Sequence, residues 1–121
     1  MTPALYLRWL GMAVFSSNFS FQGHGALLPT SFDEQTRAHI RSWLQWRYRL
    51  IPYVLGAIED AARTGLPVQR SMAMSFPGDS EAWCWDTQYL LGPALLVAPF
   101  TQAGTSTKVY LPKGEAWWDL N

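Results

Sequence analysis

The chain is poor in the residues that hold a fold together by covalent or metal bonds. It contains one cysteine and two histidines among 121 residues. A single cysteine, Cys84, excludes an internal disulfide and a multi-cysteine metal cluster, and no His-Glu-x-x-His spacing suggests zinc. We therefore expect no metal and no cofactor. Cys84 stands between two tryptophans, and we interpret it as a small buried hydrophobe rather than a nucleophile.

Net charge and long apolar runs are also lacking. Nine basic residues balance nine acidic ones, which gives a formal net charge of +0. This balance offers nothing that would attract nucleic acid or an anionic membrane. The longest apolar run, 89–100, contains Gly92 and Pro93 and is too short to span a bilayer. With no signal-peptide pattern at its start, the chain is expected to be soluble and cytoplasmic.

A long helix is the main element that the sequence predicts. Ser31 and Glu34 have the spacing of a capping box, and Gly65 supplies a stop. Pro52 lacks a backbone N–H and predicts a kink or break near residues 48–51. Apolar residues recur in steps of three and four, which predicts a core-facing stripe of Ile40, Leu44, Tyr48, Ile51, Leu55, Ile58 and Ala62.

The residues before this helix predict one β/α unit. Thr2 and Pro3 can start a first helix, whose expected apolar face is Leu5, Trp9, Met12 and Ala13. A period of two over Phe15–Phe21 then predicts a strand. His24 follows in a loop between two glycines. A helix, a strand, a polar loop and a long helix in this order are typical of an α/β architecture.

After Gly65, prolines and glycines separate short apolar runs, as in an all-β sandwich. We therefore predict two domains, residues 1–65 and residues 66–121. The candidate strands are Val68–Met74, Tyr89–Leu91, Leu95–Ala98, Thr107–Leu111 and Ala116–Asp119.

The ordered motifs of the chain resemble glycoside hydrolase family 31, which contains α-glucosidases and α-xylosidases. The resemblance covers nearly the whole chain, and its most specific part is the run Gln88–Pro99. The other segments that carry it are Ala4–Trp9, Gly23–Gly25, Arg47–Tyr53, Phe76–Asp79 and Val109–Gly114.

This resemblance implies that residues 1–65 are the end of a (β/α)₈ TIM barrel, with Phe15–Phe21 as its eighth strand. Residues 66–121 would be the truncated start of the following β-sandwich. The family's catalytic nucleophile and acid/base lie on earlier barrel segments that have no counterpart here. Retaining hydrolysis needs two carboxyl groups roughly 5–5.5 Å apart, and none of the acids follows a predicted barrel strand. We therefore expect no catalytic residue in the chain, which would be inactive alone.

His24 is the one candidate substrate-binding residue. The resemblance implies that it contacts the sugar in the subsite next to the cleaved bond. The alternative is a loop histidine that only packs beside glycine. The family usually has an arginine two residues earlier, where this chain has Gln22, and this affects how sugar hydroxyls would be recognised.

Three functions remain open from the sequence. The first is a fragment of a retaining α-glycosidase acting on terminal α-linked glucose or xylose. Its partners would be an oligosaccharide or α-glycoside substrate and the missing N-terminal part of the barrel. The second is a non-catalytic carbohydrate-binding or packing module, and the third is a non-functional remnant.

Overall fold

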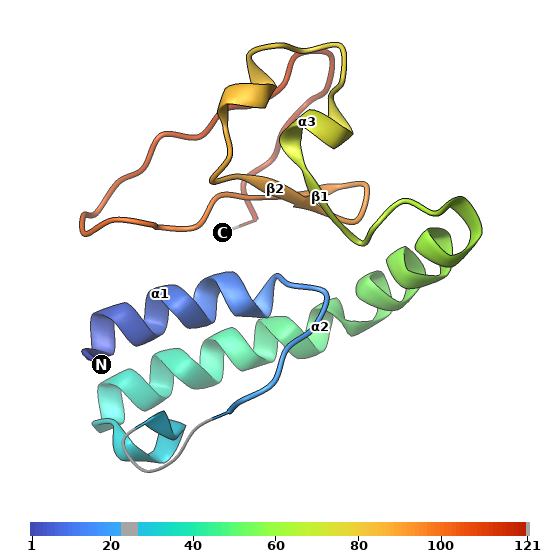
Figure 1. Ribbon diagram of the computed structural model, residues 1–121. Helices are drawn as coiled ribbons and strands as arrows, with labels where there is room; N and C mark the ends of the chain where they lie inside the picture. Colours follow the sequence, from blue (N-terminus) through green and yellow to red (C-terminus); the bar gives the residue numbers. More distant parts are fainter. Residues whose placement is uncertain (23–26, 121) are drawn as a thin grey trace.

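The computed structural model describes residues 1–22 and 27–120. Two helices, α1 (Pro3–Val14) and α2 (Glu34–Thr64), form one layer, and a small sheet with long loops lies above them (Figure 1). Short 3₁₀ turns cover Pro29–Ser31 and Ala82–Cys84. Within the described residues, no helix combines the length and the hydropathy that crossing a membrane requires.

Helix α1 begins as its sequence predicts. Pro3 is its first residue, and the Thr2 hydroxyl oxygen accepts a hydrogen bond from the Leu5 N–H at 3.3 Å. The expected apolar face is wrong, however, because Trp9 remains 59% exposed. The side chains that α1 buries are instead Tyr6, Leu10 and Val14.

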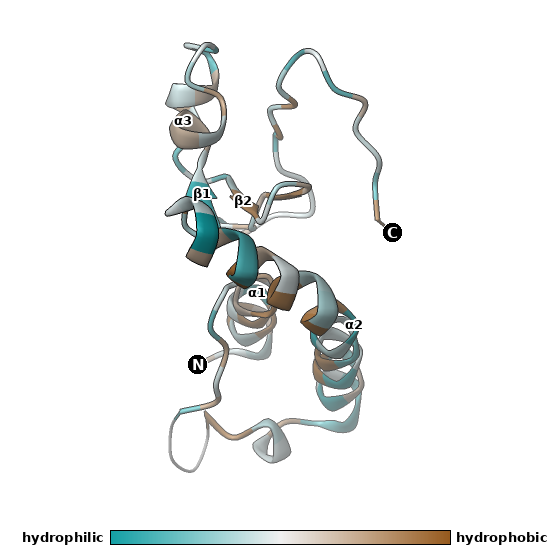
Figure 2. Cartoon of the chain, turned by 90° about the vertical axis from the view of Figure 1, so that its right-hand side faces the viewer, coloured by the Kyte–Doolittle hydropathy of each residue, from teal (hydrophilic) through white to brown (hydrophobic). Residues whose placement is uncertain are grey.

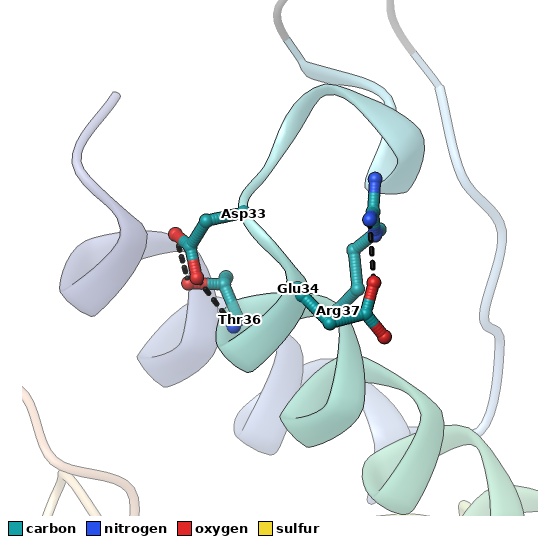
Figure 3. A network of polar contacts seen from close by, with 4 residues as sticks. All are labelled: Asp33, Glu34, Thr36 and Arg37. Atoms are coloured by element: carbon teal, nitrogen blue, oxygen red, sulfur yellow. Dashed lines mark hydrogen bonds and ion pairs between the residues drawn. The ribbon is translucent and has the colours of Figure 1, made fainter.

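The N-terminus of α2 is capped by Asp33, so the capping box predicted at Ser31 is wrong. One Asp33 oxygen accepts the Thr36 N–H at 2.9 Å, and the other accepts the Thr36 hydroxyl at 2.8 Å (Figure 3). These bonds stabilise the carboxylate and lower the pKa of Asp33. Glu34 forms an ion pair with Arg37 in the same turn. Asp33 is favoured because two acceptor oxygens can satisfy two donors at the helix end.

Helix α2 continues through Pro52 to Thr64, so of the predicted kink or break, the break does not occur. A bend is visible in Figure 1, where the first half of α2 lies beside α1 and the green second half turns towards the sheet. A proline inside a helix removes one hydrogen bond and is a known cause of bending. Gly65 ends the helix in the left-handed conformation with φ 76°, which confirms the predicted stop.

The face that α2 buries differs from the predicted one. Its buried residues are Thr36, Ile40, Leu50, Val54 and Ala57. Of the predicted stripe, Ile40 is buried as expected, but Ala62 and four large residues are exposed, and brown apolar positions recur along this part of the helix (Figure 2). We call these four the apolar stripe: Tyr48 (73% exposed), Ile51 (49%), Leu55 (55%) and Ile58 (45%).

Three short antiparallel strands form the sheet, in the order β1 (Gln69–Ser71), β2 (Tyr89–Leu91) and β3 (Leu95–Val97). Strand β2 is central, and its Tyr89 lies opposite Ser71 on one side and Val97 on the other. The predicted strands at Tyr89–Leu91 and Leu95–Ala98 are confirmed, the second one residue shorter. Gly92 makes the turn between them with φ 61°.

The other predicted strands are wrong wholly or in part. Residues 15–21 form turns and irregular backbone. The stretch predicted at Val68–Met74 gives only β1, because the Ser71 hydroxyl caps the short helix α3 (Met72–Ser75). Residues 107–111 and 116–119 are irregular. Cys84 is exposed, contrary to the buried position expected for it.

A side-chain amide binds the backbone within the irregular stretch 107–111. Gln88, which is buried, accepts the Tyr110 N–H at 2.7 Å and donates to the Tyr110 carbonyl at 3.0 Å. Both backbone groups of Tyr110 are therefore satisfied without a neighbouring strand, as buried backbone groups must be.

Two apolar clusters form the core, and Phe15 packs against both. The first joins α1 to α2 through Tyr6, Leu10, Val14 and Ile40. The second joins α2 to the sheet through Leu50, Val54 and Leu91. Trp43 and Trp46 are partly buried and pack against the first cluster.

Candidate functional site

The candidate site lies along residues 15–22, the segment that leads from α1 towards His24. We call it the approach segment. His24 itself lies outside the described residues, so its predicted sugar contact stays a prediction. The structure shows how the chain immediately before it is held. No strand pairs with the approach segment within residues 1–22 and 27–120, so its carbonyl groups are left to side chains and solvent.

Arg47, from the first half of α2, holds the beginning of this segment. Its guanidinium donates to the carbonyl oxygens of Val14 at 3.0 Å, Ser17 at 3.1 Å, and Ser16. It also lies 5.9 Å from the centre of the Phe19 ring, in cation–π contact. Burial lowers the pKa of Arg47. A cation at the C-terminus of α1 also complements the negative end of the helix dipole.

Tyr89, from β2, contacts the same region from the sheet side. Its hydroxyl hydrogen is shared between two carbonyl oxygens, that of Phe15 at 3.1 Å and that of Met12 at 3.3 Å. Burial raises the pKa of Tyr89. The approach segment is therefore held from two directions, by α2 and by the central strand.

An open cavity of about 390 Å³ lies between α1 and the approach segment. Its lining includes Trp9, Met12, Ser16, Asn18, Phe19 and Gln22. Aromatic rings beside hydroxyl and amide groups provide apolar contact together with a few oriented hydrogen bonds, as in small-molecule sites. This lining contains no acidic side chain, so it can bind a neutral polar ligand but has no carboxylate for general acid–base chemistry.

A second open cavity of about 480 Å³ is lined by Phe76, Gly78, Asp79, Ser80 and Lys113. Its one acid, Asp79, is already engaged in the fold. Asp79 accepts the Tyr110 hydroxyl at 2.7 Å and the Glu81 N–H at 3.2 Å. This carboxylate holds two loops together rather than standing ready for a ligand.

The roles of Arg47 and Tyr89 were not predicted from the sequence. A signal for Arg47 was available, because it falls in the three- and four-residue steps Thr36, Ile40, Trp43, Arg47, Leu50 and Val54. An arginine inside a buried helical stripe indicates a cation with internal partners. Tyr89 offered no comparable signal, since its partners lie more than seventy residues away.

Comparison with known proteins identifies the class to which this fold and site belong. Residues 1–57 match the family model described as "Glycosyl hydrolases family 31 TIM-barrel domain". Residues 65–121 match "Glycosyl hydrolase family 31 C-terminal domain". The chain therefore belongs to glycosyl hydrolase family 31, with the end of a barrel followed by part of the next domain. The resemblance and the fold class inferred from the sequence are confirmed.

Particular relatives are similar over nearly all of this chain. It is 37% identical to the human Neutral alpha-glucosidase AB, over 98% of this chain and 13% of that protein. It is 35% identical to the Alpha-xylosidase of Emericella nidulans, over 92% of this chain and 14% of that protein. The chain thus spans only about an eighth to a seventh of the length of these relatives.

Solved structures show the same arrangement. A family 31 alpha-xylosidase from a soil metagenome, in complex with xylose, superposes with a TM-score of 0.82 at 32% identity, over 93% of this chain and 20% of its own. A family 31 dextranase from Flavobacterium johnsoniae, in complex with glucose, gives a TM-score of 0.82 at 36% identity, over 93% of this chain and 14% of its own.

Proposed function

We propose that this chain works as the C-terminal part of a retaining α-glycosidase that removes terminal α-linked glucose or xylose. It would complete the barrel and contribute His24 to the sugar pocket, while both catalytic carboxylates come from outside residues 1–121. The observation that carries the proposal is the family match over both halves of the chain. Relatives with xylose and with glucose bound support a sugar pocket that accepts these units.

The apolar stripe on α2 supports a role as one part of a larger barrel. Tyr48, Ile51, Leu55 and Ile58 are each 45–73% exposed, on the helix that matches the end of the barrel domain. Covering one large apolar side chain contributes about 1.5–3 kcal/mol. Because these four side chains are already about half covered, burying the rest of them would contribute roughly 3–7 kcal/mol in total, a large share of a domain's stability of about 5–15 kcal/mol. The rest of the barrel is the covering layer that we propose.

Four of the nine acids of the chain are engaged in its fold, which supports the proposal that catalysis is supplied from elsewhere. Asp33 caps α2, Glu34 and Asp60 form ion pairs on the helix surface, and Asp79 holds two loops. Each of these carboxylates already has a structural partner. The purified chain is therefore expected to show no hydrolysis of aryl α-glucosides or α-xylosides. Turnover that is abolished by replacing one of its own acids would overturn this assignment.

A chimera tests the proposal directly. The segment of the Flavobacterium johnsoniae dextranase that superposes on this chain is replaced by residues 1–121, and hydrolysis of aryl α-glucosides and α-xylosides is measured. We expect activity, because a TM-score of 0.82 places the two backbones closely enough for the barrel to close. The dextranase without its own segment is the negative control. A folded chimera without activity, or one that does not fold, would count against the proposal.

His24 is tested in the same chimera. Replacing His24 with alanine should lower kcat/KM by on the order of 10- to 100-fold, the effect of losing one or two hydrogen bonds to the sugar. The other histidine is the matched control. His39 is exposed on α2, with Nδ1 2.9 Å from the Gln35 carbonyl oxygen, and its replacement with alanine should leave kcat/KM unchanged. Equal effects of the two variants would remove the proposed sugar contact.

A further inference from the structure

The approach segment depends on contacts from distant parts of the chain. Near its start, Phe15 and Ser16 donate their N–H groups to the Met12 and Ala13 carbonyls, each at 3.1 Å, which closes the last turn of α1. Beyond this turn, side chains from distant parts of the chain bind the segment's carbonyls. Arg47 reaches Ser16 and Ser17, and the Tyr89 hydroxyl reaches Phe15.

Tyr89 differs from Arg47 because it belongs to the sheet. Its backbone is fixed on both sides, opposite Ser71 in β1 and Val97 in β3. The next residues of β2 are anchored to α2, since Leu91 is fully buried against Leu50 and Val54. The Tyr89 backbone is therefore fixed by the sheet and its contact with α2, while its hydroxyl reaches the C-terminal end of α1 at Met12 and the Phe15 carbonyl that follows.

The hydrogen bond between the Tyr89 hydroxyl and the Phe15 carbonyl links the sheet to the wall of the cavity. Phe15 packs against both core clusters, and its carbonyl accepts the Tyr89 hydroxyl. Ser16, the next residue, already lines the cavity, and so do Asn18 and Phe19 a few residues on. A shift of the Phe15 carbonyl therefore moves the cavity wall directly.

We propose that Tyr89 is a positioning residue, through which the sheet holds the approach segment and the wall of the cavity beside it. This proposal rests on the proposed function only for the chemical nature of the ligand that the cavity would bind. That Tyr89 holds the approach segment in place concerns this chain alone, and it can be tested even if the chimera shows no activity. It gives the family's C-terminal domain a part in shaping the site, since Tyr89 lies in the region that matches that domain.

Hydrogen exchange of the full chain, followed by mass spectrometry at low concentration, tests this claim. Tyr89→Phe keeps the aromatic ring and removes only the hydroxyl. Peptides covering residues 13–22 should then exchange faster by on the order of five- to tenfold, the effect of one lost hydrogen bond. Peptides from the second half of α2 should keep their rates.

Tyr53→Phe is the matched control, because its hydroxyl also links two elements. The Tyr53 hydroxyl donates to the Leu91 carbonyl at 2.7 Å and accepts the Ala94 N–H at 3.0 Å. This variant should accelerate exchange at residues 92–95 and leave residues 13–22 unchanged. If both variants accelerate all peptides by one common factor, Tyr89 contributes only to global stability and the proposal is wrong.

A measurement on the unaltered chain applies even if Tyr89→Phe does not fold. Exchange is followed at rising sub-denaturing urea concentrations. If the sheet holds the approach segment, peptides 13–22 and 88–95 should open together, with the same dependence on urea. Separate opening of residues 13–22, with a shallower dependence, would overturn the proposal.

Discussion

Gly92 offers a sharp test of how α2 is joined to the sheet. It forms the β2–β3 turn with φ 61°, and a Cβ atom added there would lie 2.6 Å from the Tyr53 hydroxyl oxygen. Real Cβ atoms do not approach this closely, so Gly92→Ala forces the Tyr53 ring to move. The ring then loses its hydrogen bonds to Leu91 and Ala94.

The cost can be estimated from two terms. A left-handed backbone costs a non-glycine residue about 1 kcal/mol. Each of the two lost hydrogen bonds contributes about 0.5–1.5 kcal/mol. Gly92→Ala should therefore lower the free energy of unfolding by about 2–4 kcal/mol, as measured by urea denaturation followed through tryptophan fluorescence.

Gly65→Ala isolates the backbone term. Gly65 has φ 76°, but an added Cβ would have no atom within 4 Å. This variant should cost only about 1 kcal/mol. In a Tyr53→Phe background the hydroxyl is absent, so Gly92→Ala should cost less than in the parent chain. If Gly92→Ala and Gly65→Ala destabilise equally, the close contact with Tyr53 does not contribute and the reasoning is refuted.

Three further predictions concern other contacts. Arg47→Lys should lower the free energy of unfolding by about 1–3 kcal/mol, because one ammonium cannot donate to three carbonyls in the way the guanidinium does. Arg49→Lys, on the exposed face, should change the free energy of unfolding by less than about 0.5 kcal/mol. Similar losses for the two variants would contradict the role of Arg47. The hydrogen bond to Asp79 raises the pKa of Tyr110 from 10.0 to about 12. The contribution of this hydrogen bond to the free energy of unfolding is therefore complete below pH 10 and is lost as the pH rises from 10 to 12. Alkaline unfolding of Tyr110→Phe should show a smaller loss over this window, and parallel curves would refute the linkage. We expect the apolar stripe to mediate self-association of the chain, so Leu55→Lys with Ile58→Lys should reduce association in sedimentation without unfolding the chain. Val54→Lys, at a position 5% exposed, should instead unfold it. Unchanged association of the double variant would show that the apolar stripe does not mediate self-association.

Local sequence signals predicted the elements whose partners are close in the chain. Thr2 and Pro3 start α1, and Gly65 ends α2, because caps act within one helical turn. Strands β2 and β3 were also predicted, since the turn at Gly92 joins them directly. The order of short motifs was enough to indicate the family.

Choices between two local possibilities were less reliable. Ser31 and Asp33 both suit a helix N-terminus, and the structure uses Asp33. Likewise, α2 has two apolar stripes in steps of three and four. Which of them is buried depends on where α1 and the sheet pack, and the sequence of α2 alone does not contain that information.

By itself, then, the sequence determined where α1 begins, where α2 ends, that the strands on either side of Gly92 pair with each other, and the family to which the chain belongs. Tertiary structure alone decided what residues 15–21 and 107–111 become. Both were predicted as strands, but a strand needs neighbours with free backbone groups. Here distant side chains bind several carbonyls of the first segment and both backbone groups of Tyr110 in the second. Arg47 and Tyr89 bind the first segment, and the Gln88 amide binds the second. A hydrogen-bond partner dozens of residues away leaves no periodic trace in the local sequence, so these contacts emerge only once the chain is folded.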